Sequence, residues 1–335
     1  MAIAMTEQQR RDFDEKGYVV LDDFLSPSEL DRLLGAIDEV GARIRAAKGL
    51  GPDQPFAVWN ALAKHDAFLD LVDHPRMLPL IVDAIGWNIQ VRITHLDVRP
   101  PYPTGLVPGA LGTGRGDDAR AGYNSLQWHQ DLSRPHQFER VSLDGRLPFL
   151  ELKVGYYLSD LTEHNSGAIA LVPASYTRPA HVLRDQDYQV NPAEVVELNV
   201  RAGTAMLWRN TTWHCVTPNL SNRVRKVMYV GYNYRWIRPD DYVQQDPDLI
   251  ARSTPIRRQL LGALATGSDP LGNDPYWGPR VQHWHVFNWD DVPLKAWAEE
   301  REQAARQSAA NANEPAPDTP SAQPSATDRA ANPAL

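Results

Sequence analysis

Between residues 88 and 237 the chain repeatedly alternates short apolar segments with clusters of Gly, Pro and Asn. The segments are rich in β-branched and aromatic residues, which predicts many short strands separated by turns. This pattern is typical of a β-sandwich or a double-sheet barrel. The predicted strands are residues 88–98, 149–161, 168–175, 194–200, 203–210 and 226–237.

Helices are predicted mainly before this region. Residues 26–47 start with Ser and Pro, have an acidic first turn and repeat apolar residues at helical spacing. Shorter helical patterns cover residues 6–17 and 67–85. We expect residues 1–299 to form a single domain. Residues 300–335 are rich in Pro, Ala and Ser, so we expect them to form a disordered tail.

Charge and cysteine content narrow the class of protein. A net charge of -8 with a pI near 5.7 argues against nucleic acid or an anionic membrane as the main partner. The single cysteine, Cys215, excludes an internal disulfide framework and a cysteine-rich zinc site. No segment has the apolar length of a signal peptide core or a membrane span. We therefore expect a cytoplasmic protein that binds neither nucleic acid nor membrane.

Residues 100–124 are too rich in Pro and Gly to form a regular element, and a loop of this length inside a domain is usually functional or disordered. Its stretch GTGRGDD matches no complete phosphate-binding motif and opens no helix. We therefore reject a nucleotide site there.

A His-x-Asp triplet occurs twice, at His95 and His129. Residues i and i+2 of a strand point to the same face, so such a triplet brings an imidazole and a carboxylate to one point. A non-haem iron site that uses two histidines and one carboxylate needs a further histidine. His214 follows a predicted strand, and Arg225 stands eleven residues later. The fork of donors on an arginine at that place could grip a dicarboxylic acid.

These motifs together resemble the phytanoyl-CoA dioxygenase family of iron(II)- and 2-oxoglutarate-dependent oxygenases. The resemblance spans roughly residues 14–236 and rests on the order of the motifs. They are the opening FDEKGYVVLDDFLSPSELDRL, RPP at 99–101, the triplet at His129, NSGAIALVPASY, GTAMLWRN, and a histidine with an arginine eleven residues on.

The resemblance implies a mainly β fold with flanking helices around a double-stranded β-helix (jelly-roll, cupin-like) core. It implies that His129, Asp131 and His214 bind iron(II) and that Arg225 binds the far carboxylate of 2-oxoglutarate. Tyr156 falls where relatives often place an aromatic residue beside this cosubstrate. The triplet at His95 precedes the long loop, whereas the ligand pair of the family follows it, so His95 and Asp97 are not expected to be ligands.

The resemblance further implies that the protein uses O2 and converts 2-oxoglutarate to succinate and CO2 while it hydroxylates an unactivated C–H bond. Related halogenases replace the carboxylate ligand with a small residue, so Asp131 favours oxygenation over halogenation. Desaturation, epimerisation and ring closure stay open.

The expected substrate is a small organic molecule, and the expected assembly is a monomer or a homodimer. Residues of the long loop and beside the ligands are candidate pocket walls, because loops on a rigid scaffold often carry recognition. They are Tyr102, Tyr123, Trp128, Arg134 and Trp213. Arg134 and Arg209 could meet an anionic group or be solvated.

Two other functions are consistent with parts of the pattern. A non-catalytic jelly-roll binding module predicts that at least one key position is replaced, and none is. A zinc-dependent hydrolase could use the same three ligands with a metal-bound water, but it gives Arg225 no role. Arg223 is the rival to Arg225 as the anchor, and Cys215 is expected to point away from the ligands as a packing residue.

Overall fold

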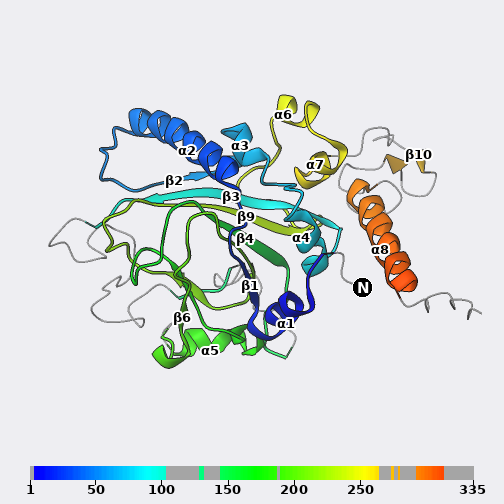
Figure 1. The fold of residues 1–335 in the computed structure, drawn as a ribbon. Coiled ribbons are helices and arrows are strands. Elements are labelled where there is room, and N and C mark those ends of the chain that lie inside the picture. The colour runs from blue at the N-terminus through cyan, green and yellow to red at the C-terminus, as the bar shows by residue number, and fades with distance from the viewer. Residues whose placement is uncertain are drawn as a thin grey trace, which may run out of the picture.

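The computed structural model describes residues 4–102, 128–131, 144–186, 189–263, 273–274, 278–279 and 292–312. Most of its strands belong to two antiparallel sheets (Figure 1). The larger sheet has the order β1-β7-β4-β9-β3-β2, and the smaller has the order β6-β5-β8. The strands are β1 Tyr18–Leu21, β2 Phe56–Trp59, β3 Ile89–Arg99, β4 Glu151–Tyr157, β5 Ile169–Leu171, β6 Val196–Glu197, β7 Ala205–Arg209, β8 His214–Val216, β9 Arg225–Tyr234, β10 Asn273–Asp274 and β11 Gly278–Pro279.

The two sheets face each other and share a core. Ile169 and Leu171 of the small sheet pack with Tyr157, Met206 and Val227 of the large sheet. We call the face of the large sheet that meets the small sheet the inner face and the opposite one the outer face. This is the jelly-roll architecture with a double-stranded β-helix core, so the predicted fold class is confirmed.

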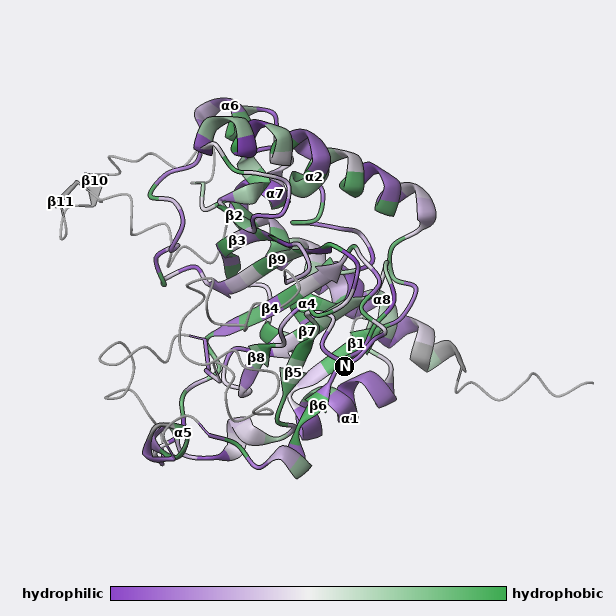
Figure 2. Ribbon diagram, turned by 90° about the vertical axis from the view of Figure 1, so that its left-hand side faces the viewer, coloured by the Kyte–Doolittle hydropathy of each residue, from purple (hydrophilic) through white to green (hydrophobic). Residues whose placement is uncertain are grey.

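Helices cover the outer face of the large sheet (Figure 1). Alternate strand residues such as Leu152, Val154 and Val230 point to them and form one large apolar cluster with helix residues such as Leu33 and Ile37. Green apolar segments accordingly line the interior in Figure 2, and purple polar segments lie mostly outside. The helices are α1 Glu7–Lys16, α2 Pro27–Lys48, α3 Asp66–Leu69, α4 Leu78–Ile85, α5 Ala180–Asp185, α6 Pro247–Ala251, α7 Pro255–Leu260 and α8 Pro293–Ala312.

Local sequence signals explain the first two helices. Thr6 and Ser26 each form a capping box with the residue three positions later, and Gly17 and Gly49 end the helices in the left-handed conformation. In the described part of the chain, no helix is long and apolar enough to cross a membrane.

The predicted domain boundary at residue 300 falls inside α8, which continues to Ala312. Residues 301–312 are therefore helical, and residues 313–335 lie outside the described residues. The division into a domain and a tail stays a prediction.

Candidate active site

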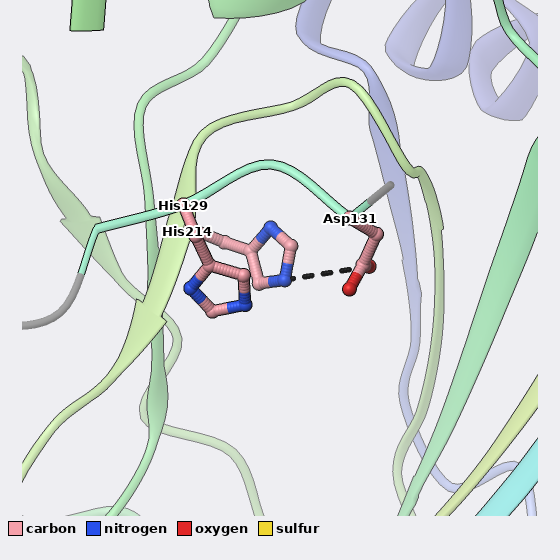
Figure 3. A group of neighbouring side chains, drawn as sticks. All are labelled: His129, Asp131 and His214. Carbon is pink, nitrogen blue, oxygen red and sulfur yellow. Dashed lines mark ion pairs between the residues drawn. The ribbon is translucent and has the colours of Figure 1, made fainter. Parts of the chain in front are cut away.

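The structure brings together His129, Asp131 and His214, whose ligand atoms all lie within 4.8 Å of one another (Figure 3). His129 does not lie in a regular strand. It exchanges two backbone hydrogen bonds of 3.0 Å with His214, the first residue of β8. The backbone N–H of Asp131 donates to the carbonyl of Asn210 at 2.8 Å. The segment 128–131 is therefore held against the β7–β8 region by its backbone.

The ring of His214 is oriented for coordination. Its Nδ1 lies 2.8 Å from the carbonyl oxygen of Thr212. Since a carbonyl only accepts, this contact places the ring proton on Nδ1 and leaves the lone pair of Nε2 for a metal. Burial and the neighbouring His129 lower the pKa of His214 to about 4, although Asp131 acts in the opposite direction. The ring is therefore neutral near pH 7, as a metal ligand must be.

The carboxylate of Asp131 uses its two oxygens differently. Oδ1 lies 3.5 Å from Nζ of Lys153, while Oδ2, 3.5 Å from Nε2 of His214, is buried and has no hydrogen-bond partner among the described residues. Burial would raise the pKa of Asp131, but Lys153 and then His214 hold it below its usual value. A buried carboxylate oxygen without a partner is costly. A cation bound between Oδ2 and the two rings would satisfy it, so the residues fit a metal with two nitrogen ligands and one oxygen ligand.

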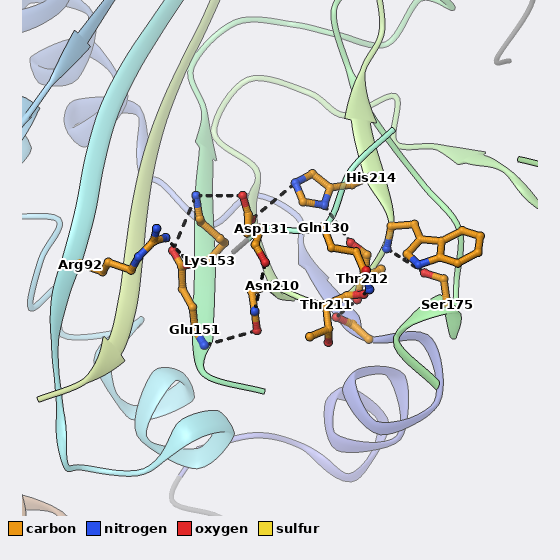
Figure 4. A network of polar contacts seen from close by, with 12 residues as sticks. Arg92, Gln130, Asp131, Glu151, Lys153, Ser175, Asn210, Thr211, Thr212 and His214 are labelled. Carbon is orange, nitrogen blue, oxygen red and sulfur yellow. Dashed lines mark hydrogen bonds and ion pairs between the residues drawn. The ribbon is translucent and has the colours of Figure 1, made fainter. Parts of the chain in front are cut away.

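A chain of alternating charges continues from Asp131 along the inner face (Figure 4). Lys153 lies 3.7 Å from Glu151, and Glu151 lies 2.5 Å from Arg92. Arg92 in turn pairs with Asp240. The register of β3 against β9 shifts between residues 91 and 93, and a bulge of this kind re-aims the inserted side chain. The shift therefore explains how Arg92 reaches Glu151.

These buried charges are balanced. Burial alone would lower the pKa of Lys153, but Asp131 and Glu151 hold it above its ordinary value, so the ammonium stays charged. Burial, together with Asp131, raises the pKa of Glu151 to about 7 although Lys153 and Arg92 oppose the shift. The network therefore holds Oδ1 of Asp131 and leaves Oδ2 facing His214.

Arg225 begins β9 and is fully buried on the inner face. Its guanidinium donates to the carbonyl oxygen of Gly167, to the carboxylate of Asp97 at 2.7 Å and to the hydroxyl of Tyr229 at 2.6 Å. An arginine side chain has five N–H donors, and the described residues accept from three of them, which leaves two for another acceptor. Gly167 has a φ of +85°, and a Cβ there would lie 2.5 Å from Cδ of Arg225. The glycine of the NSG motif therefore makes room for the arginine.

Two arginines share one carboxylate at this place. Asp97 pairs with Arg225 at 2.7 Å and with Arg99 at 2.9 Å. Burial would raise the pKa of Asp97, but Arg225 and then Arg99 hold it below its ordinary value. The three groups carry one net positive charge, which matches a single carboxylate of a ligand. Asp97, Arg99 and the predicted pocket residue Tyr102 also line a pocket of about 250 Å³.

Three predicted site residues point away from the inner face. Tyr156 lies on the outer face of β4, where its hydroxyl contacts the carbonyl of Leu71 and its ring lies beside Phe24. Strand alternation places its neighbour Tyr157 on the inner face instead. Trp128 and Trp213 pack in a separate buried cluster with Cys215. The structure therefore does not place Tyr156, Trp128 or Trp213 on the inner face, because each alternates away from the residue that faces the site, and their predicted roles stay predictions.

The remaining candidates divide clearly. Tyr123 and Arg134 lie outside the described residues. Arg223 is exposed and pairs with Asp160 at 3.0 Å, so it does not face the inner side. Arg209 packs among the rings of Phe13, Phe149 and Tyr176 and pairs with Asp14. Cys215 is buried, as predicted.

The sequence analysis missed the polar residues of the inner face, in particular Glu151, Lys153, Asp97 and Arg99. A signal was present, because charged residues alternate with apolar ones in ELKV and HLDVR. Such alternation normally indicates a solvated face. The presence of a second sheet over this face, which the alternation alone does not reveal, turns it into a buried charged interior.

Comparison with known proteins agrees with this geometry. The family model described as Phytanoyl-CoA dioxygenase (PhyH) matches residues 13–227. A curated relative, the probable alpha-ketoglutarate-dependent hypophosphite dioxygenase of Stutzerimonas stutzeri, is 24% identical over 258 residues. That match covers 68% of this chain and 78% of the relative.

Solved structures share the fold. The structure of HygX from Streptomyces hygroscopicus with nickel and 2-oxoglutarate bound has a TM-score of 0.54 at 17% identity, covering 75% of this chain and 95% of that one. The non-heme alpha ketoglutarate dependent carbocyclase SnoK from nogalamycin biosynthesis has a TM-score of 0.50 at 23% identity, covering 80% and 96%. EctD from S. alaskensis has a TM-score of 0.51 at 18% identity, covering 74% and 84%.

Proposed function

From the premise that this chain belongs to the phytanoyl-CoA dioxygenase family, and so is a non-haem iron(II)- and 2-oxoglutarate-dependent oxygenase, we propose that it hydroxylates an unactivated C–H bond of a small organic molecule. Iron(II), 2-oxoglutarate and O2 supply the oxidising power when they are bound, with succinate and CO2 as the products of the cosubstrate. The observation that carries the proposal is the cluster of His129, Asp131 and His214, in which one carboxylate oxygen has no hydrogen-bond partner in the described part of the chain.

Separate groups of residues would hold the metal and bind 2-oxoglutarate. The two imidazoles and Oδ2 of Asp131 hold the metal on one side, and Lys153 keeps Oδ1 of Asp131 turned away from it. Arg225, steadied by Asp97 and the carbonyl of Gly167, receives the far carboxylate of 2-oxoglutarate through its two remaining donors. The burial of His214 and Arg225 strengthens the charge interactions that these two side chains make.

Hydroxylation is the default outcome because Asp131 keeps the carboxylate ligand. The reactions of the relatives differ: one is a probable hypophosphite dioxygenase, and another is a carbocyclase of nogalamycin biosynthesis. The HygX structures include one with hygromycin B bound. These cases support a small-molecule substrate. A zinc hydrolase is the second candidate function. It would use the three-residue cluster, but it would leave the positive charge at Arg225 without a ligand.

The test is an anaerobic titration of the metal-free protein with iron(II) and 2-oxoglutarate, observed through the weak visible charge-transfer band of the chelate. O2 is then admitted with panels of small molecules, and succinate and product masses are measured. A band, followed by succinate and a product heavier by one oxygen atom, supports hydroxylation. A product that loses two hydrogens or keeps its mass would instead indicate desaturation, ring closure or epimerisation. Absence of the band in folded, metal-loaded protein would reject the assigned site.

A further inference from the structure

Five aromatic rings form a continuous series of contacts across the inner face. In order they are Trp59, His95, Tyr229, Trp208 and His214, and we call them the ring chain. Successive ring centroids lie 4.8, 4.6, 6.0 and 5.8 Å apart. The residues come from five different strands, β2, β3, β9, β7 and β8. The ring chain therefore results from the sheet register and not from neighbours in sequence.

The strand register explains the first two contacts, and a glycine allows the third. Trp59 is the direct cross-strand partner of His95, and His95 is the partner of Tyr229. Tyr229 and Trp208 lie on strands that both flank β4, where Gly155 is the cross-strand partner of Tyr229 and Lys153 that of Trp208. A Cβ at Gly155 would lie 3.2 Å from the ring of Tyr229 and 3.3 Å from that of Trp208. The absence of a side chain there lets the two rings meet.

The two ends of the ring chain differ in environment. His214 belongs to the metal-binding cluster, and Trp208 and Tyr229 are 2% and 5% exposed. Trp59, on the edge strand β2, is 55% exposed. The ring chain therefore joins the proposed metal site to solvent.

Hydrogen bonding does not account for two of the inner rings. Among the described residues, neither Nδ1 of His95 nor Nε1 of Trp208 has a hydrogen-bond partner. Burial, and then Lys153, lower the pKa of His95 to about 3, so this ring is neutral near pH 7. A neutral stacked ring bridges its neighbours without placing a charge between them.

We propose that the ring chain conducts electrons from Trp59 to the metal site when 2-oxoglutarate is consumed without substrate, and so spares the buried ligands from oxidation. The proposal rests on the proposed function. In such a turnover one atom of O2 enters succinate, and the other is reduced to water by two electrons from Trp59 and two protons from solvent. Trp59 supplies the two electrons, gains one oxygen atom from a water molecule and releases two protons. Tyr229 and His95 act as bridging rings and are unchanged.

The chain contains a matched reference for Trp59. Trp236 is 52% exposed and also stacks on a neighbouring ring, that of Tyr234. None of the ring contacts found among the described residues joins this pair to the ring chain. Oxidants that diffuse through solvent should attack the two tryptophans equally, whereas electron transfer through the ring chain should oxidise Trp59 alone.

The experiment incubates the full chain with iron(II), 2-oxoglutarate and O2 without substrate, measures succinate, and locates oxidised residues by peptide mass spectrometry. We expect several-fold more oxidation at Trp59 than at Trp236. In His95→Leu, oxidation of Trp59 per succinate should fall several-fold, because the ring between Trp59 and Tyr229 is gone. Iron–EDTA with hydrogen peroxide, which forms oxidant in solution, should oxidise Trp59 equally in both proteins.

The outcomes separate the two proposals. Succinate formation with equal oxidation of the two tryptophans, or with no change in His95→Leu, would overturn the ring chain and leave the oxygenase assignment intact. No succinate from folded, iron-loaded protein would overturn both. The comparison of Trp59 with Trp236 is made in the wild-type chain, so it does not depend on the folding of any variant.

Discussion

The two faces of the large sheet are built from the same strands but from different chemistry. Residues that point outward from β4 and β9 are mostly apolar and pack under the helices, whereas those that point inward include a buried charged set. The outward residues include Leu152, Val154, Met228 and Val230, and the inward ones include Glu151, Lys153 and Arg225. Apolar burial stabilises the fold, while burial of charge is costly unless every group is paired. The outer face therefore supports the fold, and the inner face uses part of that stability to hold a reactive site.

Pairing is the means by which the inner face tolerates its charges. Asp131, Lys153, Glu151 and Arg92 alternate in sign, and Asp97 lies between two arginines. The second set carries one positive charge. If this division of roles is correct, changes on the inner face should affect chemistry more than folding, and changes on the outer face should do the reverse.

The largest effect is expected from His129→Ala. Its side chain is exposed, so the midpoint of thermal unfolding of the metal-free protein should not change. Even changes behind a metal ligand typically reduce metal affinity or activity 10- to 100-fold, so we expect succinate formation to fall by more than about 100-fold. His181→Ala, an exposed histidine on α5, is the control. Retention of full activity in His129→Ala would remove this residue from the metal site.

Leu152→Ala tests the outer face. Leu152 is fully buried under the helices, and removal of such a side chain should reduce the free energy of unfolding by about 2–5 kcal/mol. The KM for 2-oxoglutarate should stay unchanged in the folded variant. Urea unfolding and steady-state kinetics measure both quantities. A raised KM at a temperature where the variant is fully folded would show that the two faces are coupled.

The alternation of inward and outward side chains along the strands also explains how far the sequence predicts this structure. The long amphipathic helix, the strand-rich region and the order of the motifs were sufficient for the fold class, because these signals are local. The structure brings together His129, Asp131 and His214, which the sequence predicted as ligands; their roles stay a prediction.

It was harder to predict the direction of individual strand side chains. That direction depends on which face of the strand packs against the helices and which packs against the second sheet. Tyr156 and Tyr157 are adjacent, and only the packing of the helices decides that Tyr156 turns outward. For Trp128 and Trp213 the same difference of one residue moved a predicted pocket wall into a separate cluster. A shift of one residue reverses the face of every side chain in a strand, so proximity in sequence does not predict proximity in the site.

Arg225→Lys tests whether the guanidinium of Arg225 binds 2-oxoglutarate on the inner face. Lysine keeps the charge but loses the fork that contacts Asp97, Gly167 and Tyr229. A hydrogen bond to a charged group contributes about 1.5–3 kcal/mol, so the KM for 2-oxoglutarate should rise roughly 10- to 100-fold. Arg223→Lys, a change in the exposed rival two residues earlier, should leave KM unaltered. The reverse result would transfer the anchor to Arg223.

The smallest effect is expected in the helix layer, where Glu29 completes the capping box of α2. The hydrogen bond from Ser26, opposed by burial and supported by His74, lowers the pKa of Glu29 from 4.5 to about 2. Because the pKa is depressed in the folded state, the stabilisation is complete above pH 4.5 and is lost as the pH falls toward 2. The side chain is 41% exposed, so solvent screening should keep the contribution below about 1 kcal/mol.

Glu29→Gln should therefore have a slightly lower thermal midpoint than the wild type at pH 6. Between pH 6 and pH 3 the midpoint of the variant should fall less than that of the wild type, since glutamine can cap without titrating. Asp31→Asn, an exposed change on the same helix, is the control and should follow the wild type. Parallel pH profiles for Glu29→Gln and wild type would mean that the ionised cap adds nothing measurable. The stability of the outer layer would then come from its apolar packing alone. Ionised groups would be important only on the inner face, which would make the difference between the two faces of the sheet larger.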